Sequence, residues 1–270
     1  MTTIQRSDVT LELDDRGEGR PVLLLHGHTL DRRVWASLAS RLRERGLRTL
    51  CPDLRGHGRS SRPDRGYHWS HHAADMAAVL EAAGVERCPV VGFSLGGGVA
   101  LEMALTLPER VAALALVAPV LPDRRWEPEF LAALKEVART IRAEGVRAAM
   151  LGPWLSSPLF APSLGVAGVR EAMEAMLGEF PGADYLATAL DAPERSWTVP
   201  QRLGEITVPT LVVSPEHDMP GFRGFADEIA TAVPGARLER PLGRGHLLPL
   251  EDPDGLAELI VGFLGATVFG

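Results

Sequence analysis

Gly92-Phe93-Ser94-Leu95-Gly96 is the most informative stretch of this sequence. An apolar run of strand character, residues 89–91, precedes it, and a run of helical spacing, residues 97–107, follows it. A strand, a G-x-S-x-G turn and a helix in this order predict a nucleophile elbow, which holds the serine Oγ out at the edge of a sheet. So tight a turn needs small residues on both sides of the serine, and the two glycines supply them. Ser94 is therefore the candidate nucleophile for attack on a carbonyl carbon.

The composition is that of a globular protein with one large domain, or one domain carrying an insertion, since 46% of the 270 residues are apolar and 23% are charged. The formal net charge of −7 argues against nucleic acid as a partner. No apolar stretch reaches the roughly 18 residues of a membrane helix, so no membrane association is expected. Residues 1–20 lack the apolar segment of a signal peptide, and Cys51 and Cys88 are the only cysteines. We therefore expect a reduced, cytoplasmic protein.

Short apolar runs alternate with helical patterns over most of the chain. Strands separated by helices predict an α/β fold with a mostly parallel central sheet and helices on both faces. The runs of strand character lie at residues 8–13, 22–25, 48–51, 89–93, 111–117, 210–213 and 236–240.

The pattern changes between residues 121 and 200, where apolar residues recur at helical spacing and no strand pattern occurs. We expect a helical lid here, inserted after the sixth strand of a core formed by residues 1–120 and 201–270. The C-terminal edge of an open α/β sheet is where ligands bind, and the lid would cover that edge.

Four further motifs accompany the elbow: Leu-Leu-His-Gly at residues 24–27, Asp-Leu-Arg-Gly-His-Gly-Arg-Ser at 53–60, Glu-His-Asp at 216–218 and Gly-His at 245–246. With them, the chain from about residue 17 to residue 264 resembles the α/β-hydrolase superfamily, in its lid-bearing group of esterases, lactonases, C–C hydrolases and perhydrolases. The resemblance implies an α/β-hydrolase fold and serine chemistry that needs no cofactor.

The resemblance also implies a triad of Ser94, Asp218 and His246. A serine hydroxyl needs a general base, and His246 lies in a glycine-rich loop that can carry its imidazole over Ser94. Asp218 follows the strand at residues 210–213 and would hold the imidazole in one tautomer. Glu216 lies two residues earlier and is the alternative acid. The chain order serine, aspartate, histidine is the one expected of this fold.

The tetrahedral intermediate needs two preorganised donors for its oxyanion. The backbone N–H of Leu95, directly after the nucleophile, should be one. By resemblance, the second is the backbone N–H of His28, which follows His26-Gly27. The His28 side chain either adds a polar contact or only lines the wall. Further candidates for the substrate pocket are Val120, Trp126, Trp154, Met219 and Leu247.

These features favour a serine hydrolase that cleaves a small or medium uncharged carboxylic ester or lactone through an acyl-Ser94 intermediate. The substrate is the only small molecule expected as a partner, and a homo-oligomer is possible. His68 and His72 have i, i+4 spacing but no nearby carboxylate or cysteine, so we expect no metal site.

Three alternatives stay open. A C–C bond hydrolase of ring-fission products would offer Arg124 or Arg125 to a substrate carboxylate. A cofactor-free perhydrolase or haloperoxidase-like enzyme would use hydrogen peroxide in place of water, although such enzymes often carry tryptophan where this chain has His28. A non-catalytic, receptor-like member of the fold would bind a small ligand without hydrolysing it.

Overall fold

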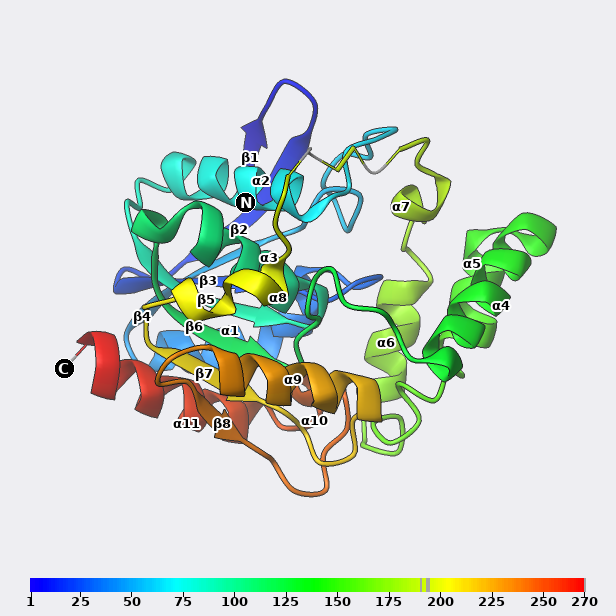
Figure 1. The fold of residues 1–270 in the computed structure, drawn as a ribbon. Helices are drawn as coiled ribbons and strands as arrows, with labels where there is room; N and C mark the ends of the chain where they lie inside the picture. Colours follow the sequence, from blue (N-terminus) through cyan, green and yellow to red (C-terminus); the bar gives the residue numbers. More distant parts are fainter. Residues whose placement is uncertain (190, 193–194, 270) are drawn as a thin grey trace.

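An eight-stranded sheet forms the centre of the computed structural model, which describes residues 1–189, 191–192 and 195–269 (Figure 1). The strand order is β1-β2-β4-β3-β5-β6-β7-β8. The strands are β1 (Thr2–Gln5), β2 (Thr10–Arg16), β3 (Arg20–Leu25), β4 (Leu47–Pro52), β5 (Cys88–Phe93), β6 (Val111–Val117), β7 (Thr210–Val213) and β8 (Arg237–Glu239).

The sheet is parallel from β4 to β8, and only the β1–β2 and β2–β4 pairs are antiparallel. Every residue of β5 and β7 is buried, because helices cover both faces of the sheet. This arrangement confirms the predicted α/β-hydrolase architecture. The polar edge strand β1 was not predicted, and β2 extends to Arg16, beyond the predicted run at residues 8–13.

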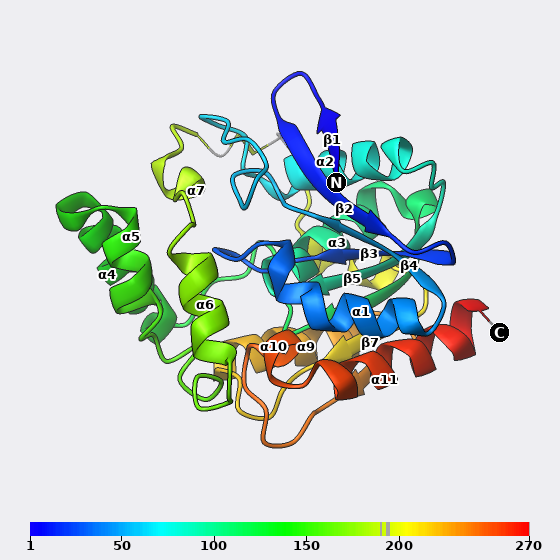
Figure 2. The same cartoon turned by 180° about the vertical axis from the view of Figure 1, so that it is seen from behind.

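Helices α1 and α11 pack on one face of the sheet, while α2, α3 and α9 lie towards the other (Figures 1 and 2). These layers bury two apolar clusters, one on each side of the sheet. The helices are α1 (Ala36–Glu44), α2 (Trp69–Ala82), α3 (Leu95–Thr106), α4 (Pro128–Glu144), α5 (Val146–Ala149), α6 (Val169–Leu177), α7 (Ala183–Leu186), α8 (Val199–Arg202), α9 (Pro220–Ala232), α10 (Leu248–Glu251) and α11 (Pro253–Leu264), with short helical turns at Arg32–Trp35, Pro108–Arg110, Met150–Trp154, Leu203–Glu205 and Gly265–Phe269.

The described residues between β6 and β7 form helices α4 to α8 joined by turns and loops. We call residues 121–200 the helical insertion. Helices α4 to α7 stand beside the core at one end of the sheet (Figure 1). Trp154 and Met173 are buried in the same cluster as one face of the sheet. The division into a core and a lid at these boundaries stays a prediction. Residues 190, 193 and 194 of the predicted lid, and residue 270 of the predicted core, lie outside the described part.

Among the described residues, no helix is both long enough and apolar enough to cross a membrane. The two cysteines, Cys51 and Cys88, are buried and unpaired by disulfide. Burial raises the pKa of each thiol to about 12, so both remain protonated at neutral pH.

Candidate active site

Ser94 occupies a sharp turn between β5 and α3. Its backbone has φ +51° and ψ −112°, which is a rare and strained combination for a residue with a side chain. Hydrogen bonds fix the turn on both sides. The Ser94 N–H donates to the Val117 carbonyl at 2.9 Å, and the Ser94 carbonyl accepts from the Val120 N–H at 3.0 Å. The end of β6 therefore holds the strained residue in place.

The two glycines that flank Ser94 are sterically required. A Cβ atom on Gly92 would lie 2.3 Å from the Gly96 carbonyl oxygen, and one on Gly96 would lie 2.1 Å from the Leu25 carbonyl oxygen. Neither contact can be relieved by a side-chain movement, because both neighbours are backbone atoms. The sequence pattern therefore marks a turn that only glycine can complete at these two positions.

His246 and Asp218 form a buried pair. The His246 Nδ1 atom lies 2.9 Å and 3.0 Å from the two carboxylate oxygens of Asp218. The Met219 N–H donates to Asp218 Oδ1 at 2.8 Å, which fixes the carboxylate. Phe222 packs edge-on against the imidazole with ring centroids 4.6 Å apart. Glu216, the alternative acid, instead accepts a hydrogen bond from the Gly243 N–H at 2.8 Å.

A second carboxylate braces the loop that carries His246, and the sequence pattern did not reveal it. Glu251 of α10 accepts the Gly245 N–H at 2.8 Å and the Ser163 hydroxyl at 2.6 Å. The Ser163 Oγ in turn accepts the Leu247 N–H at 3.2 Å. Ser163 belongs to the helical insertion, so the insertion and α10 jointly hold the backbone on both sides of His246.

Two backbone N–H groups are available beside Ser94. Leu95 is the first residue of α3, and its N–H has no acceptor within the helix. His28 lies in a β-turn after β3, which the Leu30 N–H closes by donating to the Gly27 carbonyl at 3.3 Å. Neither the His28 nor the Leu95 N–H donates to a backbone carbonyl of the described residues. The two groups predicted to bind an oxyanion, one in the elbow and one in the turn after β3, thus have no hydrogen-bond acceptor among the backbone carbonyls of the described residues.

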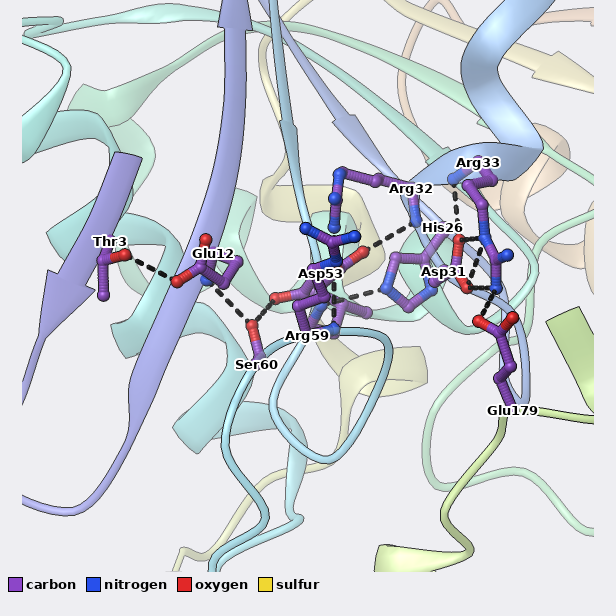
Figure 3. A network of polar contacts seen from close by, with 11 residues as sticks. Thr3, Glu12, His26, Asp31, Arg32, Arg33, Asp53, Arg59, Ser60 and Glu179 are labelled. Carbon is purple, nitrogen blue, oxygen red and sulfur yellow. Dashed lines mark hydrogen bonds and ion pairs between the residues drawn. The ribbon is translucent and has the colours of Figure 1, made fainter. Parts of the chain in front are cut away.

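His26 ties the turn after β3 to the loop after β4. Its Nδ1 donates to the Gly27 carbonyl at 2.9 Å, and its Nε2 accepts the Leu54 N–H at 2.9 Å. Burial, and then the neighbouring His57, lower the pKa of His26 to about 3, so the ring is neutral. In Figure 3, His26 stands beside Asp53, whose carboxylate accepts the Arg32 and Arg59 N–H groups. His26 therefore fixes the backbone at Gly27 and Leu54 and does not act as a base.

Ser94, Leu95, His28 and His246 line one cavity of about 430 Å³. Its wall is mainly aromatic and aliphatic. The predicted pocket residues Val120, Trp126, Trp154 and Leu247 line it as well, whereas Met219 does not. The Met219 side chain is buried in the core, because the backbone turns there into α9. Lining residues that the sequence pattern did not indicate as pocket candidates include Tyr67, Trp69, Phe93, Leu134, Asp184 and Phe222.

One corner of the cavity is polar. The His28 Nε2 atom lies 2.6 Å from Asp184 Oδ2, which comes from α7 of the helical insertion. Burial raises the pKa of Asp184, but the His28 ring and its hydrogen bond lower it more, and the net pKa lies well below the ordinary value. Asp184 is therefore a carboxylate, and the His28 side chain does more than fill the wall. No sequence pattern marked Asp184.

A protein-family model described as alpha/beta hydrolase fold matches residues 20–253. This match spans most of the 270 residues. The chain belongs to the α/β-hydrolase fold family.

This α/β-hydrolase is 30% identical over 270 residues to a putative carbamate hydrolase, RutD, of Azorhizobium caulinodans, and the match covers 96% of each chain. It is 28% identical to a putative non-heme chloroperoxidase of Synechocystis sp., over 98% of this chain and 99% of the relative. Among solved structures, Est816, described as an N-acyl homoserine lactone degrading enzyme, matches with a TM-score of 0.81 and 28% identity over 97% of this chain and 100% of Est816. These relatives support a hydrolase and differ in their reactions.

The remaining predicted groups of the α/β-hydrolase lie outside the cavity. Arg124 is paired with Glu228 of α9, and Arg125 is exposed. Neither is among the residues that line the cavity. His68 accepts the Ser70 N–H as the N-cap of α2, and His72 is buried. The described residues contain no group of three or more side chains that could hold a metal ion.

Proposed function

We propose that this α/β-hydrolase is a serine hydrolase that cleaves a small or medium uncharged carboxylic ester or lactone through an acyl-Ser94 intermediate. One observation carries the proposal. The strained Ser94 turn and the buried His246–Asp218 pair, with Nδ1 2.9 Å from the carboxylate, meet at the same cavity of about 430 Å³. This combination is what acyl transfer to a serine requires.

In the acylation step, Ser94 Oγ attacks the carbonyl carbon while His246 Nε2 takes the hydroxyl proton. Asp218 accepts the hydrogen bond of Nδ1–H and stabilises the imidazolium that forms. The carbonyl oxygen becomes an oxyanion, which the N–H groups of His28 and Leu95 bind. Collapse of the intermediate expels the alcohol, which takes the proton from His246. Water then repeats the sequence on the acyl-enzyme and releases the acid.

The cavity wall supports an uncharged substrate of modest size. Its volume of about 430 Å³ lies at the lower end of the range for small-molecule sites. Aromatic side chains such as Trp126, Phe130 and Phe222 form much of the wall. The lactone named for Est816 and the carbamate named for RutD are both carbonyl compounds with a leaving group, which fits the same acyl-transfer chemistry.

The alternative functions differ in the side chains or co-substrates that they require. A C–C bond hydrolase needs a cation for the substrate carboxylate, but Arg124 is paired with Glu228 and the described lining contains no arginine or lysine. A perhydrolase would share the triad and differ only in the acceptor of the acyl group. Dependence of product formation on hydrogen peroxide separates it from an esterase. A non-catalytic, receptor-like protein would bind esters without turnover.

Hydrolysis of p-nitrophenyl esters from acetate to decanoate tests the proposal. We expect the wild-type protein to prefer one chain length, and Ser94→Ala to lose activity by a factor of about 10³ to 10⁶. Ser40→Ala, a change of the same type on α1 and away from the cavity, is the matched control. Wild-type protein that is folded and inactive on every ester would contradict the proposal. Assays with peroxide, ring-fission products and ligand binding would then follow.

A further inference from the structure

The turn that carries His28 is held by two side chains of the helical insertion. The indole Nε1–H of Trp154 donates to Thr29 Oγ1 at 2.8 Å, and both groups are buried. The Thr29 hydroxyl in turn donates to the His28 carbonyl at 2.6 Å. The second contact is the 2.6 Å hydrogen bond between the His28 ring and Asp184 of α7. The turn therefore makes direct hydrogen bonds to two separate parts of the insertion.

The turn itself is strained. Thr29 is its third residue and has φ +63°, which is the left-handed conformation that type II turns require at this position. Glycine normally takes that place, and a β-branched residue there is an outlier. Such a conformation persists where the surroundings over-determine it. The two hydrogen bonds of the Thr29 hydroxyl, to Trp154 and to the His28 carbonyl, help to hold Thr29 in this conformation.

We propose that Trp154 and Asp184 are positioning residues, which fix the His28 backbone N–H in the direction that an oxyanion requires. This inference rests on the function proposed above. Trp154 acts through Thr29: its N–H holds the hydroxyl in one rotamer, and the hydroxyl fixes the His28–Thr29 peptide plane through the His28 carbonyl. The His28 N–H belongs to the adjoining Gly27–His28 peptide, which shares the His28 α-carbon with that plane. Asp184 acts on the same residue through the His28 ring. If the insertion moved away from the core, the Trp154–Thr29 and His28–Asp184 hydrogen bonds would both break. The His28 N–H is therefore correctly oriented only when the insertion is packed against this turn.

The position of the Trp154 ring is itself well determined. Only 2% of Trp154 is exposed. Phe160 packs edge-on against it with ring centroids 5.2 Å apart, and Phe130 does so at 6.1 Å. Because the indole is fixed, its N–H points in a fixed direction. A positioning role requires this fixed direction, whereas a residue that only fills the cavity wall does not.

A double-mutant cycle between the two ends of the link tests the proposal. Trp154→Phe removes the indole N–H, and Thr29→Val removes the hydroxyl while keeping the side-chain shape. We expect each change to lower kcat for p-nitrophenyl acetate by about 10-fold to 100-fold, with KM changed by less than about 3-fold, since a misplaced oxyanion donor weakens only transition-state binding. Because both changes break one link, the double variant should lose no more than the worse single variant.

Three further comparisons separate positioning from wall packing. Thr29→Gly accepts the left-handed conformation without strain. Adding Trp154→Phe to this variant should therefore lower kcat by a smaller factor than Trp154→Phe does in the wild-type protein. Trp126→Phe removes another indole from the cavity wall and should change KM more than kcat. Asp184→Asn keeps an oxygen that can accept a hydrogen bond from the His28 ring, and it should retain more kcat than Asp184→Ala.

Hydrogen exchange of the residue 27–30 amides gives a readout that does not need activity. We expect faster exchange at this turn in Trp154→Phe, with little change at the buried strand β5. Additive losses of kcat in the double variant, or effects on KM alone, would overturn the positioning role in an active enzyme. Unchanged exchange at the turn would overturn it even if the wild-type protein hydrolyses no ester. A wild-type protein that hydrolyses no ester would count against the proposed function. The positioning role of Trp154 would then be decided by the hydrogen-exchange result.

Discussion

The Ser163 hydroxyl donates a 2.6 Å hydrogen bond to Glu251 Oε1, directly behind the loop that carries His246. The other carboxylate oxygen accepts the Gly245 N–H at 2.8 Å. Both side chains are buried, so each hydrogen bond is formed away from water. The helical insertion therefore contacts the histidine loop as well as the turn of His28, and both loops that flank Ser94 depend on it.

Glu251→Ala should destabilise the protein and lower its activity. The change leaves the Gly245 N–H and the Ser163 hydroxyl without an acceptor, at a cost of about 1–3 kcal/mol in the free energy of unfolding for each unsatisfied group. Urea unfolding measures this cost, and kcat should fall because the His246 backbone loosens. The matched control is Glu258→Ala on α11, which removes an exposed ion pair with Arg45 and should cost less than about 1 kcal/mol. Equal losses in the two variants would contradict the role of Glu251.

Two glycine-to-alanine changes should have opposite effects on stability. Gly96→Ala places a Cβ atom 2.1 Å from the Leu25 carbonyl oxygen, and the backbone must move to relieve the contact. We expect a loss of more than about 3 kcal/mol in the free energy of unfolding, or no folded protein. Gly224 lies in α9, where an added methyl group would meet no neighbouring atom within 4 Å, so Gly224→Ala should stabilise by about 0.5–1 kcal/mol. Thermal unfolding compares them, and similar values would refute the steric account.

The sequence indicates the elements that position the proposed catalytic residues because their signals are local. Ser94 stands in a turn that two glycines make possible, and the strand and helix on either side are contiguous in the chain. The short apolar runs identify most of the parallel strands because both faces of those strands are covered. Met219 shows the limit of this reasoning: it is adjacent to Asp218 in the chain, but the start of α9 turns its side chain into the core.

The supporting groups could not be found in this way. Asp184 and Glu251 are single carboxylates in four-residue helices, and nothing local distinguishes them from solvated charges. Their partners, His28 and Ser163, lie 156 and 88 residues away in the chain. Such contacts depend on where the insertion packs, which periodicity and motif spacing do not specify.

Stability should fall on acidification because buried histidines are neutral in the folded protein. Burial, and then His57, lower the pKa of His26 from 6.5 to about 3, and burial also lowers the pKa values of His57 and His72. The unfolded chain binds these protons near pH 6.5 and the folded chain does not. The contribution of His26 to stability is therefore complete above pH 6.5 and is lost as the pH falls towards 3, at about 1.4 kcal/mol per pH unit. His57 and His72 add to the loss of stability in the same direction.

Urea unfolding at pH 7.5, 5.5 and 4.5 measures this dependence. Histidine NMR spectra over the same range should show the His26 ring as the neutral Nδ1–H tautomer throughout, since Nε2 accepts the Leu54 N–H. A His26 signal that titrates near pH 6.5 in the folded protein would contradict the prediction, whatever the unfolding curves show.

The enzyme should discriminate against anionic esters. The described residues that line the cavity include no lysine or arginine, and Asp184 contributes a carboxylate whose pKa is held low by the His28 ring. A substrate carboxylate would enter a largely apolar cavity without a lysine or arginine to pair with it, close to the carboxylate of Asp184. We expect kcat/KM for the mono-p-nitrophenyl ester of glutaric acid to be on the order of 100-fold lower than for p-nitrophenyl hexanoate.

Asp184→Asn removes the negative charge of the carboxylate and should reduce this ratio of kcat/KM values severalfold. The matched control is Glu179→Gln, which changes an exposed carboxylate of the insertion and should leave the ratio unaltered. Equal hydrolysis of the two esters by the wild-type enzyme would show that the cavity recruits a cation on binding and would return the C–C hydrolase alternative to consideration.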